Sequence, residues 1–366
     1  MSEPSRPDLS DRSREGLAAF FRHFARTEAP QLGSALYEAF CDGVADDAEL
    51  LAIAARAQPG QTPVNMMFAA VQFLLLRGEG RELAARYPTL SGCPAPGLER
   101  SRTEIFPLFR AFCLDHRDEI EELVATRRVQ TNVIQRCVCL LPAFATVVAE
   151  AADDRPLSLI EIGPSAGLNL QWDRYRYVYP TSPDPTAWGD PGSTVKLTTE
   201  LRGGQGLPSL APPLEVAWRI GIDVRPVDLA DEDAVTWLRA LIWPEHVERH
   251  ARLRAAIDIA RADPIRLVEG DAVDALPGIV AEAPNETLLA VFATFALYQI
   301  PRDRLRQLLA SMQSASKQRA IAFVSIESSG TTWSEVFLTW YRRGERSTRK
   351  LAHCNPHGRW LEWREA

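Results

Sequence analysis

Leu159-Ile-Glu161-Ile-Gly163-Pro-Ser165-Ala-Gly167-Leu-Asn169 runs from an apolar stretch into a turn of small residues. Leu157–Ile162 has the length and composition of a buried strand, and Glu161 places a carboxylate near its end. A ligand can approach the backbone of a glycine-containing turn closely. The helix expected after the turn would direct free N–H groups at that ligand. The segment therefore predicts a strand–turn–helix unit of an α/β protein, with a ligand site at the turn.

Short apolar runs and helical patterns alternate through the rest of this half of the chain. Further strands are expected at Ala217–Val224, Ile265–Glu269, Leu288–Phe292 and Ala320–Ile326, and helices at Ala234–Ile242, His246–Arg261 and Arg302–Met312. The last runs, Val336–Arg342, Thr348–His353 and Trp360–Trp363, are separated only by turn residues. This order predicts a mostly parallel sheet with antiparallel strands at its C-terminal edge.

The chain before this sheet has a different character. Apolar residues recur at helical spacing from Leu17 to Val148, which predicts an all-α domain over residues 15–151 after a flexible N-terminus over residues 1–14. The α/β domain then occupies residues 152–366. Within it, residues 180–213 are rich in Pro, Gly, Ser and Thr and are expected to form a long insertion.

The composition excludes several classes of protein. Among 366 residues, 46% are hydrophobic and 24% charged, which is typical of a folded globular protein. The 48 acidic and 41 basic residues give a net charge of −7, which disfavours a nucleic-acid partner. Six cysteines are too few for a disulfide scaffold, and the longest apolar run, Leu288–Ile300, is too short to cross a membrane. We expect a cytoplasmic protein with a small-molecule ligand and no membrane partner.

The turn resembles motif I of class I S-adenosylmethionine-dependent methyltransferases, whose pattern is acid-x-G-x-G-x-G. Here Ser165 stands at the middle glycine. The resemblance implies a Rossmann-like sheet and a loop that packs on the methionine and ribose parts of S-adenosylmethionine. The residues that it assigns to this loop are Glu161, Gly163, Pro164, Ser165, Gly167 and Asn169.

Three later segments resemble the next methyltransferase strands in the same order. The resemblance implies that Asp223, after Arg219-Ile-Gly-Ile, binds the ribose hydroxyls and that Asp271 faces the adenine amino group. It places Thr294, in Val291-Phe-Ala-Thr, on the other side of the cofactor. Asp271 is at least as well suited to cap the helix that follows it, and Asp223 could instead cap the turn after its strand. Gly163 and Asp223 are farther apart than the usual interval, so the insertion is expected before the second strand.

The chain from about residue 15 to its end also resembles an uncharacterised bacterial family, domain of unknown function 2332. The segments that carry this resemblance are Val129–Asn132 with Arg136, Gly163–Tyr177, Trp188–Asp190, Gly221–Asp228 and Trp237–Pro244. Gln130, Asn132 and Arg136 precede the first strand, where a helix could fold over the cofactor. The other interpretation is a polar helix start that Asn132 caps. This family implies no activity.

Two alternatives to a methyltransferase arise from the same turn. Gly163-Pro-Ser165-Ala-Gly167 fits the G-x-S-x-G elbow of a serine hydrolase, with His353 or His357 and Asp271 or Asp303 as partners. A non-catalytic binding protein is the other alternative. The methyltransferase interpretation names no catalytic residue, because methyl transfer depends mainly on alignment.

No metal site is expected from the sequence. His246 and His250 share a helix face, but the zinc-protease motif needs Glu directly after the first His. We expect these two imidazoles to lie on a solvated helix face.

Overall fold

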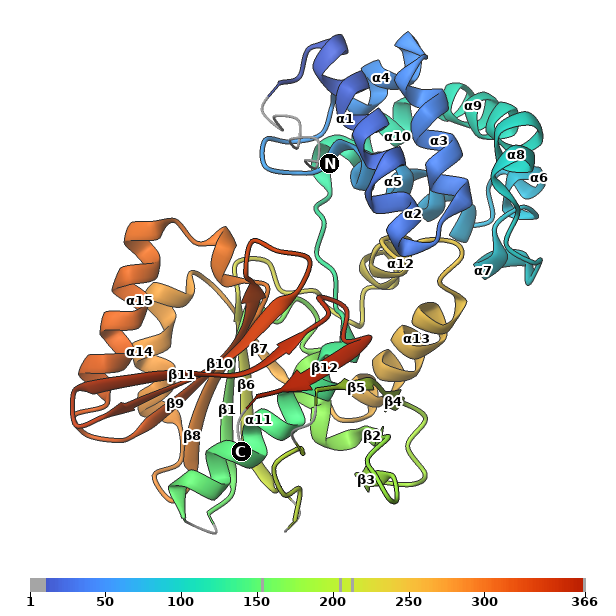
Figure 1. Ribbon diagram of the computed structural model, residues 1–366. Coiled ribbons are helices and arrows are strands. Elements are labelled where there is room, and N and C mark those ends of the chain that lie inside the picture. Colours follow the sequence, from blue (N-terminus) through green and yellow to red (C-terminus); the bar gives the residue numbers. More distant parts are fainter. Residues whose placement is uncertain (1–10, 153–154, 204–205, 212–213, 365–366) are drawn as a thin grey trace. The chain divides into compact units, whose positions relative to one another are not determined.

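The computed structural model describes residues 11–152, 155–203, 206–211 and 214–364. The chain forms two compact units, shown in Figure 1. The first comprises Met1–Thr131 and Ala230–Ala251, and the second comprises Asn132–Leu229 and Arg252–Ala366. The sequence placed a boundary at residue 151, whereas here the division falls at 131. A later segment also returns to the first unit.

The elements described in the first unit are helices. The N-terminal flexible segment was expected to reach residue 14, but the first helix begins there: Ser13 Oγ accepts a hydrogen bond from Gly16 N at 3.0 Å. The helices of this unit are α1 (Arg14–Arg26), α2 (Glu28–Leu32), α3 (Ala35–Ala45), α4 (Ala48–Ala54), α5 (Pro63–Leu76), α6 (Arg81–Ala84), α7 (Pro88–Ser91), α8 (Leu98–Arg100), η1 (Ser101–Ile105), α9 (Phe106–Asp115), α10 (Arg117–Thr126), α12 (Glu232–Ala240) and the start of α13 (Val247–Ala262).

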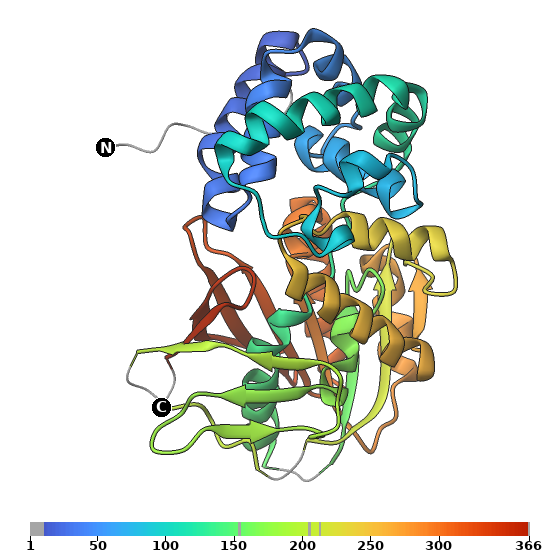
Figure 2. The same cartoon turned by 90° about the vertical axis from the view of Figure 1, so that its right-hand side faces the viewer.

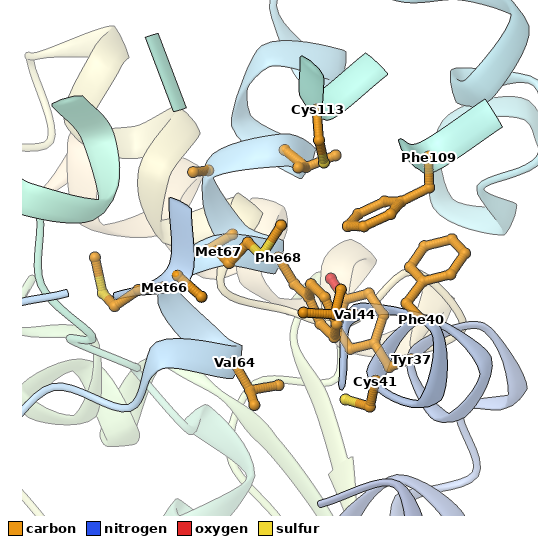
Figure 3. Close-up of a cluster of buried hydrophobic side chains, with 14 of the residues drawn as sticks. Tyr37, Phe40, Cys41, Val44, Val64, Met66, Met67, Phe68, Phe109 and Cys113 are labelled. Atoms are coloured by element: carbon orange, nitrogen blue, oxygen red, sulfur yellow. The ribbon is translucent and has the colours of Figure 1, made fainter. Parts of the chain in front are cut away.

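An aromatic cluster forms the core of the first unit. Helix α5 is apolar on nearly all sides, and such helices are buried by their neighbours. Figure 3 shows Phe68 of α5 beside Tyr37 and Phe40 of α3 and Phe109 of α9. The Phe40 and Phe109 rings stack with centroids 4.3 Å apart, and those of Tyr37 and Phe68 lie 4.5 Å apart. Such aromatic pairs add to the stabilisation from burial.

The returning segment, residues 230–251, completes this core. The Trp243 ring lies 5.2 Å from Tyr37, and the Trp237 indole N–H donates to Arg128 O at 2.7 Å. Gln72 Nε2 donates to Ile242 O at 2.6 Å, across a separation of 170 residues. Buried hydrogen bonds of this kind are costly to break, because the polar partner left behind stays out of water. The segment is therefore an integral part of the first unit.

The expectation of a solvated face for the two histidines is wrong. His250 is buried, its Nε2 lies 3.0 Å from Ile242 O, and His246 Nε2 lies 2.8 Å from Leu32 O. Burial lowers the pKa of His250 to about 4, so its ring is neutral at physiological pH. Both imidazoles hydrogen-bond to backbone carbonyls: His246 joins the returning segment to α2, and His250 joins two parts of the returning segment.

The second unit is built on a nine-stranded sheet, mostly parallel, with the order β5-β12-β11-β10-β9-β8-β1-β6-β7 (Figure 1). Strands β9 to β12 pair antiparallel, as expected for the C-terminal edge. The strands are β1 (Leu157–Ile162), β5 (Glu200–Arg202), β6 (Val216–Asp223), β7 (Arg266–Glu269), β8 (Leu288–Thr294), β9 (Ile321–Ser328), β10 (Ser334–Arg342), β11 (Glu345–Cys354) and β12 (Trp360–Trp363).

Helices cover both faces of the parallel strands. Ile160 and Ile162 face a core shared with α14 (Ala272–Glu282) and α15 (Arg302–Ala315). The other face carries α11 (Cys137–Ala151), which follows the short helix η2 (Ile134–Arg136): Phe144 of α11 lies 5.5 Å from the Phe292 ring. Because neighbouring residues of a strand point to opposite faces, Glu161 lies on the α11 side of the sheet.

The expected insertion is largely ordered. Its strands β3 (Thr186–Trp188) and β4 (Lys196–Thr198) pair with β2 (Arg176–Tyr179), which precedes the insertion. The three strands form a sheet of order β3-β2-β4 and lie side by side in Figure 2. The next strand, β5, pairs with β12 and so joins the large sheet. Residues 204–205 and 212–213 of the insertion lie outside the described residues.

One helix has the length and hydropathy of a membrane span. Residues Ile134–Ala151 have a mean hydropathy of 1.4, but 78% of them are buried within the protein. A core helix of a soluble protein has the same properties, because it is apolar all round and covered by its neighbours. The burial of this helix is compatible with a soluble protein.

Candidate functional site

The turn after β1 has a backbone that few side chains allow. Gly163, Ser165 and Gly167 have φ values of 70°, 54° and 73°, in the left-handed region. A Cβ on Gly163 would lie 2.6 Å from Ala296 Cβ, so this position also needs glycine for space. The turn leads into a seven-residue 3₁₀ helix, η3 (Leu168–Arg174), and not into the expected α-helix. The dipole of a long helix is therefore not available to a ligand at this turn.

Asp223, at the end of β6, holds the turn in place. Its Oδ2 accepts a hydrogen bond from Ser165 N at 2.9 Å, and its Oδ1 accepts one from Arg225 N at 2.9 Å. The side chain is only 8% exposed. Pro164 packs toward β6, since a Cβ on Gly221 would lie 2.6 Å from its Cγ. The carboxylate thus joins the ends of two adjacent parallel strands.

Glu161 is a buried carboxyl group with one unsatisfied oxygen. It is 1% exposed, and its Oε2 has no hydrogen-bond partner among the residues described. Its Oε1 accepts a long hydrogen bond from Asn169 Nδ2 at 3.4 Å. Burial raises the pKa of Glu161 to about 8, and the charge of Asp223 raises it further, while Asn169 and Arg136 oppose the rise.

Asn169 links three elements around this carboxyl group. Its Nδ2 also donates to Thr294 Oγ1, at 3.3 Å, and its Oδ1 accepts from Cys137 Sγ at 3.5 Å. Thr294 ends β8, Asn169 lies in η3, and Cys137 begins α11. The structure thus brings together Glu161, Asn169 and Thr294, which the sequence identified, and Cys137, which it did not.

Arg136 places a buried cation next to Thr294. Its Nε donates to Pro356 O at 2.9 Å, its Nη1 donates to Thr294 O at 3.5 Å, and its guanidinium lies 4.0 Å from the Phe295 ring centroid. Burial lowers the pKa of Arg136 to about 10, so it stays charged at neutral pH. Among the described side chains, no carboxylate lies within ion-pair distance of it. Phe295 itself has a φ of 57°, a strained value for this residue type.

The cluster lies at the carboxyl ends of two adjacent parallel strands. Along the chain the five parallel strands are β1, β6, β7, β8 and β9, and β1 lies between β6 and β8. The chain thus leaves β1 toward one side of the sheet for β6 and later crosses to its other side for β8. In open α/β sheets, ligands bind beyond the carboxyl ends of the strands at such a switch point. Glu161 is the last residue but one of β1, and Thr294 is the last residue of β8, the two strands that meet there.

Comparison with known proteins identifies the family of the whole chain. A family model described as "uncharacterized protein conserved in bacteria (DUF2332)" matches residues 18–363. The chain belongs to this family. The match confirms the whole-chain resemblance seen in the sequence. No curated protein and no solved structure matches the chain significantly.

Other predicted site residues of this DUF2332 chain lie elsewhere or have other partners. Asp271 caps α14, since its Oδ1 accepts from Val273 N at 2.8 Å, and its Oδ2 pairs with Arg304 Nη2 at 2.8 Å. Gln130 belongs to the first unit. Asn132 begins the second unit and does not cap a helix; its buried Nδ2 has no hydrogen-bond partner among the described residues.

The hydrolase arrangement is not formed in the DUF2332 chain. Ser165 Oγ is buried and makes no hydrogen bond to any described residue. His353 Nε2 instead lies 3.2 Å from Lys350 Nζ, and its ring stacks on Trp333. A serine nucleophile needs a base within hydrogen-bond reach, and Ser165 lacks one here. In the part of the chain that the structure describes, no three His, Cys, Asp or Glu side chains are grouped to hold a metal ion.

Proposed function

We propose that this protein binds S-adenosylmethionine beyond the carboxyl ends of β1, β6 and β8, and that it transfers the methyl group to a small molecule. The order of the parallel strands supports a Rossmann-like sheet of the methyltransferase type. The switch point coincides with the turn that resembles methyltransferase motif I. The net charge of −7 favours a small acceptor over a nucleic acid, in a cytoplasmic protein.

The observation that carries the proposal is the unpartnered oxygen of Glu161. A buried carboxyl oxygen without a hydrogen bond is costly, and evolution retains such a cost chiefly at functional sites. An ammonium group would satisfy it and would stabilise the ionised carboxylate. S-adenosylmethionine carries such an ammonium group on its methionine part.

Arg136 supplies the complementary charge. Its guanidinium is buried without a carboxylate partner in the described part of the chain, and its Nη1 lies near the carbonyl of Thr294. A carboxylate of a ligand would pair with it, because guanidinium and carboxylate groups match in geometry. The buried carboxyl group of Glu161 and the buried guanidinium of Arg136 therefore suit the ammonium and carboxylate groups of one α-amino acid.

The remaining residues fit the cofactor unequally. In this proposal Asp223 binds the ribose, because each of its oxygens keeps a lone pair beyond the backbone bond it accepts. Gly163 and Gly167 supply the positive φ values that this turn needs, and Ala296 and Leu267 fill the space where their side chains would lie. Asp271 is engaged as a cap and an ion pair, so we do not assign it to the adenine. The fit is therefore best at the amino-acid end.

When bound, S-adenosylmethionine supplies an electrophilic methyl carbon. The contribution of this chain is to bind and orient: Glu161 and Arg136 fix the amino-acid end, and Asp223 holds the turn. Thr294 and Asn169 keep the Glu161 carboxyl group in position. Alignment alone accounts for a large share of the rate of such a transfer, so a dedicated base is not required.

Isothermal titration calorimetry with S-adenosylmethionine and S-adenosylhomocysteine tests the proposal. We expect binding in the micromolar range, lost in Gly163→Arg and weakened at least about tenfold in Glu161→Gln, which removes the charge facing the ammonium group. Glu345→Gln, in the exposed hairpin between β10 and β11, is the matched control and should bind as the parent does.

Absence of binding by the folded parent protein would overturn the proposal. Mass spectrometry of small molecules retained after purification adds a second measurement. A retained cofactor with no methylated product from any acceptor would favour a non-catalytic binding protein over a methyltransferase.

A further inference from the structure

A cavity lies at the end of the large sheet opposite to the candidate site. It has a volume of about 570 Å³ and is lined by the end of α11, the start of β8, the turn before β9 and the end of β10. Its charged lining consists of Arg155, Arg319, Arg342 and Glu150. Strand β8 has seven residues, so the cavity at its start is about 20 Å from Thr294 at its end. The two sites do not share residues.

Arg319 is fixed in the wall of this cavity. Its Nη1 donates to Ala283 O at 2.9 Å, and its Nη2 donates to Thr287 O at 2.7 Å. Its Nε is buried and has no partner among the described residues. Burial lowers the pKa of Arg319, the charge of Arg155 lowers it further, and the charge of Glu286 opposes the fall. Arg155 lines the same cavity, so two guanidinium groups belong to its wall.

Arg342 adds a third positive charge. Its guanidinium lies 3.9 Å from the centroid of the Trp340 ring. The cavity's carboxylate, Glu150, accepts from the Trp340 indole N–H at 2.6 Å and pairs with Arg349. Glu150 is therefore already neutralised by an arginine outside the lining. Among the residues described, Arg342 has no carboxylate partner.

We propose that this cavity binds a small multivalent oxyanion, the phosphate group of a phosphorylated metabolite. Guanidinium groups present several N–H donors in a planar fork that fits phosphate oxygens. A phosphate monoester carries close to two negative charges at neutral pH, enough to offset the repulsion between the cavity arginines. The volume leaves room for the organic part of the ligand.

Titration of the full chain with inorganic phosphate by calorimetry, at constant ionic strength, tests this assignment. We expect saturable binding that weakens about tenfold in Arg342→Gln and in Arg155→Gln. Arg346→Gln, in the same β10–β11 hairpin but outside the lining, is the control and should bind phosphate as the parent does. Circular dichroism shows whether each variant is folded, and neither substituted side chain is buried.

The assignment would be overturned by no saturable binding of phosphate, by equal weakening in Arg346→Gln, or by replacement of phosphate by chloride at equal ionic strength. Tighter binding of succinate than of phosphate would also overturn it, because a dicarboxylate site is a different class of site. Binding of S-adenosylmethionine should be unchanged in all three variants, so a failure here leaves the other proposal intact.

Discussion

Glu161→Gln should stabilise the second unit, and the gain should depend on pH. Folding raises the pKa of this carboxyl group from an ordinary value of 4.5 to about 8. Between these two values the folded protein holds a proton that the unfolded chain has released. The free energy of unfolding then falls by about 1.4 kcal/mol for each pH unit as the pH rises. Below pH 4.5 both states are protonated, and above pH 8 both are ionised.

The magnitude depends on the width of this window. A rise in the pKa from 4.5 to about 8 corresponds to about 5 kcal/mol in the free energy of unfolding. The parent protein loses this stability between these two pH values, and Glu161→Gln does not. The variant should match the parent near pH 4.5 and exceed it most at pH 8 and above. Such a gain on neutralising one side chain is typical of a functional group kept at the expense of stability.

Hydrogen exchange of the β1 amides reports on the second unit alone, so it suits a protein of two units. We would compare the free energy of opening of Leu157–Ile162 in the parent and in the variant from pH 5 to pH 8.5. Glu345→Gln, exposed in the hairpin, is the control and should leave the free energy of opening of these amides as in the parent. A difference for Glu161→Gln that is also independent of pH, or that shrinks as the pH rises, would refute the reasoning.

Three more predictions concern single positions. Gly163→Ala should lower the free energy of unfolding by about 1–3 kcal/mol, because φ is 70° at this position and the added Cβ would clash with Ala296. Gly278→Ala is the control: it lies in open space on α14 and should raise the free energy of unfolding by about 0.5–1 kcal/mol. Urea denaturation measures both values. Folding lowers the pKa of His250 from 6.5 to about 4, so the first unit should lose about 3 kcal/mol as the pH falls from 6.5 to 4. His250→Phe should reduce this dependence in hydrogen exchange of α5 amides, and an unchanged pH profile would contradict a neutral buried ring. Binding of S-adenosylmethionine at pH 7 should release nearly one proton from Glu161. The measured binding enthalpy should then vary with the ionisation enthalpy of the buffer. A binding enthalpy that is the same in all buffers would show that this carboxyl group does not contact the ammonium group.

The strands of the second unit were largely predictable. Leu288–Phe292 and Ala320–Ile326 were identified from apolar runs alone, and they correspond to β8 and β9. Both strands are buried on both faces, so their composition does not depend on a partner far along the chain. The pairing of β5 with β12, in contrast, joins segments about 160 residues apart, and no local pattern indicates it.

The division into units was less predictable for the same reason. Residues 230–251 form an amphipathic helix and a turn that would suit the crossover of an α/β domain. Residues 230–251 belong to the first unit only because Trp237 and Trp243 pack into an aromatic core formed by residues far earlier in the chain. The burial of His250 results from that fit as well, and the polar spacing of α13 did not indicate it.

The candidate site was predicted in part. The turn identified Glu161 and Asn169, because a strand end followed by small residues is recognisable in the sequence itself. Cys137 and Phe295 were missed, since a buried thiol and a strained φ have no sequence signal of their own. The sequence left two roles open for Asp271, adenine binding and helix capping, and in the structure it caps α14.

The interrupted first unit has a consequence for how the protein is made. A ribosome releases Gln72 long before Ile242, its partner 170 residues later, and β1 and β6 emerge in between. The helices that are synthesised first therefore wait, with Tyr37 and Phe73 uncovered, until Trp243 and Trp237 arrive. During that interval they present an aromatic surface that chaperones recognise. A chain that ends at Thr131 would keep this surface open permanently, so the helical half should aggregate when it is expressed alone.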